Sequence, residues 1–353
     1  MITEVIGWDI GGAHLKVAHI DGDGVIKSAH QLACPLWQGL NQLQEAIAVV
    51  EQTLDVESLN QCRHAVTMTA ELVDLFDNRD HGVDAILTLL KQIIHSEQLW
   101  IFCGRNGLLA INQVQPVHFR VIASANWLAS AMLIADSLPA ALVIDIGSTT
   151  TDIVAIENHQ VLSSAVSDYD RLLTDELVYT GIVRTPVMAV SDHSYFQGNR
   201  VPLMAEYFAT MADVYRISHE LPVNADQGET ADGKDKSLEA STRRLARMIG
   251  LDQQSASNSQ WLMLAKSLRA KQLEKISSAT RRVLSTITGS GIPLIGAGVG
   301  RFLVDDIAFQ CGLEYQGYTD IIAAQTKTKV LGDVADCAPA VAVACLLHQQ
   351  HCK

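Results

Sequence analysis

The segment DIGGAHLK at residues 9–16 combines residue types that can bind a phosphate group. Asp9 is predicted to end a strand, and Gly11 and Gly12 to form a turn where backbone N–H groups approach phosphate oxygens without hindrance from a Cβ. Asp9 would face a hydrated magnesium ion, and Lys16 would supply a positive charge. Because Gly-Gly turns after strands are also common without a ligand, this segment needs support from elsewhere in the sequence.

The segment DIGSTTTD at residues 145–152 repeats this arrangement in the middle of the chain. Asp145 takes the position of Asp9, and Asp152 is a second candidate for a metal-held water. The alternative is a polar hairpin whose threonines bond to their own backbone. Two Asp-x-Gly units in one chain argue against that alternative. The candidate phosphate ligands are the residues of the turn: Gly147, Ser148, Thr149 and Thr150.

A third glycine-rich segment lies between a predicted strand and a predicted helix. Its glycines are Gly296, Gly298 and Gly300, and they would let a nucleotide or a phosphorylated donor approach the start of the helix. Such a pattern alone is weak evidence. It becomes informative here because it follows the two Asp-x-Gly segments in the chain.

The elements that must hold these segments follow a repeated order. Hydrophobic periodicity predicts three strands at 4–10, 15–20 and 25–29. A helix at 40–54 and a fourth strand at 64–69 follow them. A second run of strands is predicted at 140–146, 151–156 and 160–164. The sequence therefore predicts an α/β protein with duplicated β-β-β-α-β-α units. Its first lobe would span 1–138, joined by a C-terminal helix at 335–353, and its second lobe 139–334.

Composition excludes several classes of function. The 353-residue chain has a formal net charge of −13, which repels the backbone of a nucleic acid. No stretch reaches the roughly 18 apolar residues of a membrane span, and the start lacks a signal-peptide pattern. We expect a cytoplasmic protein that binds neither nucleic acid nor membrane. The seven cysteines are scattered, so we expect reduced, structural thiols.

Two regions of the sequence remain open to alternatives. The polar segment at 224–241 is either a mobile lid or a solvated connector. Near the C-terminus, His348, His351 and Cys352 are either the frayed end of a helix or part of a metal site. The oligomeric state is open as well, and a homo-oligomer is compatible with the sequence.

The three glycine-rich segments, in this order and spacing, resemble the phosphate-one, phosphate-two and adenosine motifs of the actin, sugar-kinase and heat-shock ATPase superfamily. This resemblance implies a two-lobed, ribonuclease H-like fold that holds a phosphate or diphosphate and Mg²⁺ between its lobes, with ATP as a further candidate ligand. Five segments also resemble the hydantoinase/oxoprolinase-related family linked to tetrahydromethanopterin-dependent one-carbon metabolism. They are CPLWQGL, MTAELVDLFDNRDHGV, ASANWLAS, LVYTGIVRTPVMAV and ADGKDKSLEASTRRLARMIG.

The family resemblance implies a transferase of methanofuran biosynthesis. Such an enzyme joins an aminomethyl-furan methanol diphosphate to the phenol of a glutamyltyramine-type or tyrosine-type acceptor and releases diphosphate. Magnesium held by Asp9 and Asp145 would neutralise the leaving group. The phenol also needs a base. The candidates for this base are Asp168, Asp170 and Glu176, with surface carboxylates as the alternative for each.

Arg184 is a candidate for contact with a phosphate, and a structural salt bridge is its alternative role. Two other functions remain open on the same fold. One is an ATP-dependent small-molecule kinase or ATP-coupled hydrolase, and the other is a nucleotide-binding regulator without catalysis.

Overall fold

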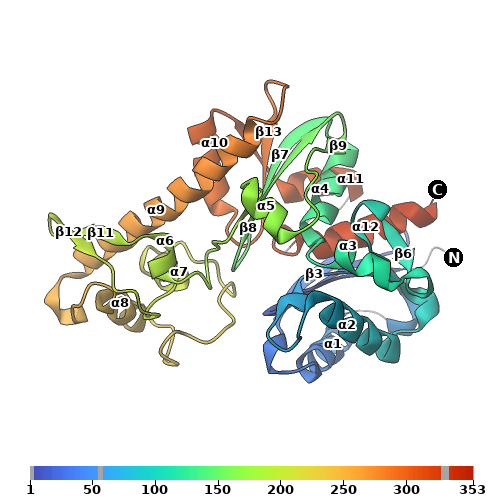
Figure 1. The fold of residues 1–353 in the computed structure, drawn as a ribbon, viewed down its shortest axis with the longest axis horizontal. Coiled ribbons are helices and arrows are strands. Elements are labelled where there is room, and N and C mark those ends of the chain that lie inside the picture. Colours follow the sequence, from blue (N-terminus) through green and yellow to red (C-terminus); the bar gives the residue numbers. More distant parts are fainter. Residues whose placement is uncertain (1–3, 55–58, 327–333, 353) are drawn as a thin grey trace. The chain divides into compact units, whose positions relative to one another are not determined.

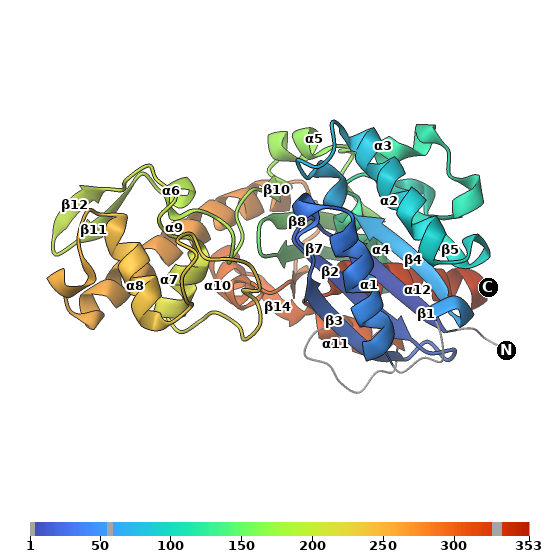
Figure 2. The same cartoon turned by 90° about the horizontal axis from the view of Figure 1, so that it is seen from below.

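The computed structural model describes residues 4–54, 59–326 and 334–352, which divide into two compact units (Figures 1 and 2). Unit 1 consists of Met1–Val143, Val154–Leu173 and Gln316–Lys353. Unit 2 consists of Ile144–Ile153 and Thr174–Tyr315. The boundaries differ from the predicted lobes of 1–138 with 335–353 and 139–334.

Side-chain contacts explain why the segment 154–173 belongs to unit 1. Arg79 donates to Asp168 at 2.8 Å. Arg105 donates to the carbonyl oxygens of Val161 and Ser163. These bonds connect the segment to parts of unit 1 that are distant in sequence, and pattern analysis along the chain does not reveal them.

Unit 1 contains a six-stranded sheet with the order β3-β2-β1-β4-β5-β6. Its strands are β1 (Val5–Ile10), β2 (His14–Ile20), β3 (Ile26–Ala33), β4 (Arg63–Met68), β5 (Leu99–Phe102) and β6 (Leu108–Ala110). β1 pairs antiparallel with β2 and parallel with β4, so the turn after β1 and the end of β4 lie at the same edge. The third strand runs four residues beyond its predicted end at 29, because β2 provides pairing partners as far as Ala33.

Helices cover both faces of this sheet (Figures 1 and 2). The helices of unit 1 are α1 (Asn41–Thr53), α2 (Arg79–Ile93), α3 (Phe119–Ile122), α4 (Asn126–Ser137), α5 (Asp168–Leu173), α11 (Tyr318–Thr326) and α12 (Ala338–Cys352). Ile6, Trp8 and Ile10 of β1 join an apolar cluster with residues of α1 and α2. Alternate residues of β1 point to the opposite face, towards α12.

Gly7 allows α12 to approach β1 closely. A Cβ on Gly7 would collide with the carbonyl oxygen of Ala340 and would lie 2.8 Å from the Cβ of Ala344. Small residues on α12 therefore pack directly against the strand backbone. Because Asp9 follows Gly7 by two residues, this packing also fixes the strand that carries the candidate carboxylate.

The second sheet repeats the order of the first. It runs β10-β8-β7-β13-β14, and β9 also pairs with β8. Its strands are β7 (Ala140–Ile146), β8 (Thr151–Glu157), β9 (Gln160–Val161), β10 (Leu177–Val178), β13 (Pro293–Ala297) and β14 (Glu314–Gly317). In each sheet, the strand that ends in an Asp-x-Gly segment lies between its hairpin partner and a strand from later in the chain. This repeated order confirms the predicted two-lobed α/β fold of the actin, sugar-kinase and heat-shock ATPase type.

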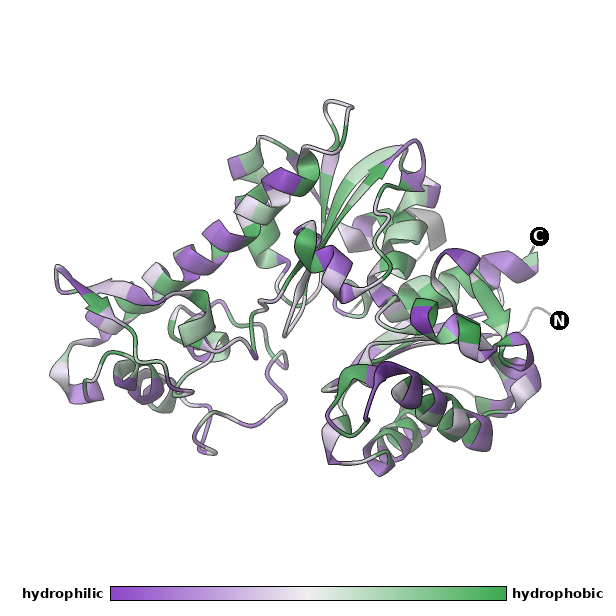
Figure 3. Cartoon of the chain, viewed as in Figure 1, coloured by the Kyte–Doolittle hydropathy of each residue, from purple (hydrophilic) through white to green (hydrophobic). Residues whose placement is uncertain are grey.

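Unit 2 contains helices and a hairpin inserted between β10 and β13. These elements are α6 (Val187–Val190), the hairpin β11 (His193–Phe196) and β12 (Asn199–Pro202), α7 (Met211–Ile217), α8 (Leu238–Arg247) and α9 (Asn258–Leu284). α10 (Phe302–Cys311) follows β13. α9 begins at a capping box of Ser257 and Gln260, and its apolar and polar residues alternate along the ribbon in Figure 3.

A buried histidine in the first sheet is held in its neutral form. Trp8 Nε1 lies 3.0 Å from His64 Nδ1, and His64 Nε2 lies 2.8 Å from the carbonyl oxygen of Leu59. Because the indole N–H can only donate, Nδ1 must accept and Nε2–H must donate to the carbonyl. Burial lowers the pKa of His64 to about 4.

We expect this histidine to contribute to acid instability. In the unfolded chain the imidazole binds a proton near its ordinary pKa of 6.5, whereas the folded chain resists protonation until about pH 4. The contribution is about 3 kcal/mol, fully present above pH 6.5 and lost as the pH falls towards 4. Urea unfolding across this range should show a weaker pH dependence for His64→Gln than for the wild type. The exposed His95→Gln should retain the wild-type dependence, and equal slopes for all three proteins would contradict the assignment.

Two expectations from composition concern membranes and cysteines. Within the described ranges, no single helix has both the length and the apolar character of a membrane span. The bent pair Pro116–Ile122 and Asn126–Ser137 passes the same test of length and composition. The seven cysteines all lie in the described ranges, and none of them forms a disulfide there. Burial raises the pKa of Cys34 and Cys62 to about 11, which keeps these two thiols protonated.

Candidate functional site

The second Asp-x-Gly segment forms a tight turn in unit 2. Asp145 lies at the end of β7, and the Gly147 N–H donates to the carbonyl oxygen of Thr150 at 2.8 Å. The backbone of residues 182–184 donates hydrogen bonds to this turn. The Ile182 N–H donates to the Gly147 carbonyl at 3.1 Å, and the Arg184 N–H donates to the Ser148 carbonyl at 2.8 Å. These bonds fix the backbone of the loop that carries the predicted phosphate ligands.

The third glycine segment packs directly against the second. Gly298 has a φ of +79°, and a Cβ at this position would collide with Asp145 Oδ1 and with the carbonyl oxygen of Ile146. The Gly300 N–H donates to that same carbonyl at 2.8 Å. Gly296 instead faces the ring of Tyr315. The structure thus brings Asp145, its turn and Gly298 into one site, although they are far apart in sequence.

A buried amide secures the backbone that supports this turn. Gln272 of α9 donates to Thr180 Oγ1 at 2.7 Å and to the Gly181 carbonyl at 2.9 Å. Its own carbonyl oxygen accepts from the Tyr215 hydroxyl at 2.5 Å. Burial raises the pKa of that phenol, so Tyr215 remains a donor. Sequence reasoning missed Gln272, because a single glutamine within an amphipathic helix carries no distinguishing pattern.

The first Asp-x-Gly segment forms a corresponding site in unit 1. Asp9 is 3% exposed at the end of β1, and Lys16 lies directly opposite on β2 with its Nζ 3.8 Å from the Asp9 carboxylate. The turn closes through the Gly11 N–H, which donates to the His14 carbonyl at 2.9 Å. Asn126, at the start of α4, places its Nδ2 3.5 Å from Asp9 Oδ1. The sequence indicated Asp9 and Lys16 but not Asn126.

A second polar cluster lies in unit 1 around Glu71, which sequence reasoning did not single out. Glu71 is 1% exposed, and its Oε1 accepts from the Ser124 hydroxyl at 2.8 Å. Ser124 also lies 3.2 Å from Asp168 Oδ2, which accepts from Arg79 at 2.8 Å. Burial raises the pKa of Glu71 to about 7. The only sequence signal was its place in the family-like segment MTAELVDLFDNRDHGV.

The predicted base candidates have other partners. Asp168 forms an ion pair with Arg79. Asp170 accepts from the Ser167 hydroxyl at 2.7 Å at the start of α5, and this bond lowers the pKa of Asp170. Glu176 is partly buried, and its backbone carbonyl accepts from Ile153. Arg184 is exposed, and its backbone N–H donates to the Ser148 carbonyl of the second Asp-x-Gly turn.

The residues of the unit 2 site suit magnesium bound together with a phosphate. Among the described residues, no three His, Cys, Asp or Glu side chains gather into a ready-made metal cage. Mg²⁺ in phosphate sites typically uses one or two carboxylates and completes its shell with water and phosphate oxygens. Asp145 at the end of β7, together with Ser148 and Thr149 of the turn that follows it, provides such a donor set. Asp152 lies on β8 opposite Leu177 of β10, which places it beyond the turn itself.

The C-terminal histidine and cysteine form no such cage. The sulfur of Cys352 lies 3.7 Å from His348 Nε2, whereas the His351 ring packs edge-on against Trp100. His351 therefore turns away from the other two residues.

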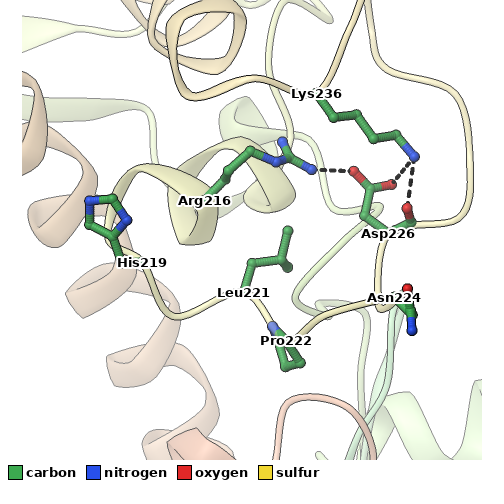
Figure 4. Close-up of a pocket in the computed structure, with 7 residues that line it drawn as sticks. All are labelled: Arg216, His219, Leu221, Pro222, Asn224, Asp226 and Lys236. Atoms are coloured by element: carbon green, nitrogen blue, oxygen red, sulfur yellow. Dashed lines mark hydrogen bonds and ion pairs between the residues drawn. The ribbon is translucent and has the colours of Figure 1, made fainter.

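Unit 2 also has a cavity of about 430 Å³ (Figure 4). Its walls include Arg216, His219 and Lys236. Asp226 accepts from Arg216 at 2.5 Å and pairs with Lys236 at 3.3 Å, so both cations share one carboxylate. No site residue predicted from the sequence lines this cavity. Its positive groups are largely balanced by Asp226 and by the neighbouring ion pairs of the 224–241 segment.

This chain is similar in sequence to known proteins. The hydantoinase/oxoprolinase family model matches residues 63–349. A protein of Methanocaldococcus jannaschii, the (4-{4-[2-(γ-L-glutamylamino)ethyl]phenoxymethyl}furan-2-yl)methanamine synthase, is 28% identical over 98% of this chain and 98% of its own. The synthase of the same name from Methanococcus vannielii is 29% identical over 42% of this chain and 70% of its own.

One similar solved structure agrees on the fold. A nucleotide-free structure of acetone carboxylase, an enzyme of ATP-dependent acetone carboxylation, has a TM-score of 0.58 at 12% identity. The match covers 97% of this chain and 70% of that one. Component A of the (R)-2-hydroxyglutaryl-CoA dehydratase of Acidaminococcus fermentans has a TM-score of 0.49 at 10% identity, over 99% and 100% of the two chains. The family model spans most of the chain, and the chain therefore belongs to the hydantoinase/oxoprolinase family.

Proposed function

We propose that this enzyme forms an aryl-alkyl ether. In the proposed reaction, an aminomethyl-furan methanol diphosphate reacts with the phenol of a glutamyltyramine-type or tyrosine-type acceptor and releases diphosphate, in a pathway to a methanofuran-like cofactor. The proposal draws on the synthase of M. jannaschii, which aligns over 98% of both chains and whose name describes a phenoxymethylfuran methanamine.

The chemistry of such a donor defines what the protein must do. A furfuryl carbon tolerates positive charge because the furan ring delocalises it. The bond from this carbon to the diphosphate oxygen therefore breaks readily, and its electron pair leaves with the diphosphate. The principal task of the site is to stabilise the charge that develops on the leaving group. Backbone N–H groups and short hydroxyl side chains at a tight turn are suited to this task.

The observation that carries the proposal is the contact between Gly298 and Asp145. Gly298, which has a positive φ, lies directly against the Asp145 carboxylate. Hydrogen bonds from the backbone of 182–184 fix the adjacent turn. Asp145 is thereby held in one position beside Ser148 and Thr149. Magnesium held by Asp145, and by Asp9 in its own unit, would supply further charge neutralisation for the diphosphate.

An ATP-dependent kinase or hydrolase is the competing function. The segment Gly296–Gly300, which runs from the end of β13 towards α10, has the arrangement that accommodates nucleotides in many proteins. The acetone carboxylase structure shares the fold alone, so it does not favour either ligand.

Calorimetric titration with Mg-diphosphate and, separately, with Mg-ATP distinguishes the two functions. We expect diphosphate binding, weakened about 10- to 100-fold in Asp145→Asn and in Asp9→Asn, because each change removes a charged ligand. Asp175→Asn is the control, because Asp175 forms an exposed ion pair with Arg282. Strong binding of Mg-ATP with no response to Mg-diphosphate would reject the transferase and favour the kinase or a nucleotide-binding regulator.

A further inference from the structure

Glu71 is a buried carboxyl group with one unused oxygen. In the part of the chain that the structure describes, Oε2 of Glu71 is buried without a hydrogen-bond partner, and so is the Thr67 hydroxyl. A buried polar atom without a partner is costly, and in a native protein it usually marks a place where a ligand or water binds. Both atoms belong to the carboxyl end of β4 and the short helical turn Ala70–Leu72 that follows it.

These atoms lie at the same sheet edge as the first Asp-x-Gly turn. Thr67 pairs with Asp9 in the parallel register of β4 and β1, and the Thr69 N–H donates to the Ile10 carbonyl at 2.9 Å. A single short segment also connects the two groups. Ser124 contacts Glu71, and Asn126, two residues later, contacts Asp9. In parallel α/β sheets, ligands bind at this carboxyl edge.

Counting protons around Ser124 shows that Glu71 can exchange one. The single hydroxyl proton of Ser124 faces two carboxyl groups, Glu71 Oε1 at 2.8 Å and Asp168 Oδ2 at 3.2 Å. Both contacts can be hydrogen bonds only if one carboxyl group is protonated. Asp168 accepts from the Arg79 guanidinium at 2.8 Å, whereas Glu71 is 1% exposed, and burial favours the neutral form of a carboxyl group. When the pair of carboxyl groups carries one proton, that proton therefore belongs on Glu71, which then donates to Ser124 while Ser124 donates to Asp168; the ionised Glu71 instead accepts from Ser124.

We propose that Glu71 accepts the proton of the incoming phenol, and that Ser124 and Asp168 carry this proton outward. This inference rests on the proposed ether-forming function. The phenol O–H bond breaks and its oxygen forms the new C–O bond, while the old C–O bond breaks with its electron pair on diphosphate. The phenol proton binds the Glu71 carboxylate and reaches solvent through the Ser124 hydroxyl and Asp168, which is partly exposed.

The surroundings of Glu71 set its protonation close to neutral pH. Burial raises the pKa of Glu71 to about 7, although the hydrogen bond from Ser124 lowers this pKa. Of the charged groups, Arg79 of α2 lowers the pKa of Glu71 and Asp168 of α5 raises it. A base must be ionised to act. The rate should therefore rise with pH through about 7.

The test compares the Glu71→Gln enzyme with the wild type in a diphosphate-release assay across pH. We expect kcat to fall about 10²- to 10⁴-fold, as is typical when a general base is removed, and the acid limb near pH 7 to disappear. A ring-fluorinated acceptor with a more acidic phenol should narrow the gap between variant and wild type, because it needs less help from a base. A purely structural role for Glu71 would leave that gap unchanged. Glu97→Gln, at an exposed position of the same unit, is the control.

A second measurement needs no substrate. Infrared titration of the wild type should show a protonated carboxyl band that disappears near pH 7 and is missing from Glu71→Gln. Ser124→Ala should shift this titration, because it breaks the connection to Asp168. Titration of Glu71 in the ordinary range of a glutamate, or an unchanged acid limb in an active Glu71→Gln enzyme, would overturn the inference. If the wild type forms no ether, the proposed function is rejected. The infrared titration then still tests whether Glu71 exchanges a proton near neutral pH.

Discussion

Gly298→Ala should abolish most of the binding of Mg-diphosphate, with a loss of about 100-fold or more in affinity. The added methyl group would collide with Asp145 Oδ1 and with the carbonyl oxygen that accepts from Gly300. The left-handed backbone of Gly298 adds about 1–2 kcal/mol of strain for a residue with a Cβ. The carboxylate would have to move, and a displacement of about 1 Å is enough to impair a binding site severely.

Gly291→Ala is the control that separates the effect of displacing Asp145 from the effect of backbone strain alone. Gly291 also has a positive φ, +69°, but a Cβ there would meet no atom within 4 Å. Both variants should therefore lose a comparable amount of unfolding free energy from backbone strain, and only Gly298→Ala should lose diphosphate binding. Calorimetry and urea unfolding on the two variants measure these effects. Equal diphosphate affinity in both variants would show that the contact with Asp145 does not position a ligand group.

Arg244→Met should lower the free energy of unfolding by about 3–5 kcal/mol, because it removes a fully buried cation from the two carboxylates to which it donates. Arg244 is fully buried in α8, where it donates to Asp213 at 2.7 Å and to Asp232 at 2.9 Å. Arg244 also donates to the backbone carbonyl of Asp235 at 3.1 Å. The guanidinium therefore holds the 224–241 segment against α7.

The neighbouring arginine is a matched control. Arg243 pairs with Glu239 one helical turn away at 3.2 Å, on the exposed side of α8. Arg243→Met should cost only about 0.3–0.5 kcal/mol, as is usual for surface pairs of this spacing. Thermal and urea unfolding compare the two variants. A similar loss in both would mean that the buried ion pairs of Arg244 contribute no more than a surface pair.

Hydrogen exchange on the same proteins tests whether the 224–241 segment is a lid. The ion pairs of Arg216, Lys236 and Arg244 all reach carboxylates in or beside this segment. If these pairs hold it closed, its backbone amides should exchange slowly in the wild type and faster in Arg244→Met. Equally fast exchange in both proteins would favour the solvated connector.

Much of the fold could be predicted from the sequence, because its signals are local. The turns at Asp9 and Asp145 are each set by glycines within four residues of the strand end, and the repeat of strand, turn and strand is visible by comparing the two segments. The helix α1 follows the hydrophobic spacing of its own residues, and α12 follows a continuous apolar run. The boundary between the two units was less predictable, because Arg79 and Arg105 connect unit 1 to residues 154–173 through side-chain contacts.

The sequence by itself determined the two Asp-x-Gly turns, the glycine segment at 296–300 and the duplicated order of strands, because neighbouring residues are sufficient to specify each of them. The tertiary structure alone decided which residues meet. It brought Gly298 against Asp145, and it surrounded Glu71 with Arg79, Ser124 and Asp168 from three other segments. The charge state of a carboxyl group depends on burial and on charges within a few ångströms of it. Ser124 and Asp168 come from distant parts of the chain, which is why Glu71 had no signal of its own in the sequence.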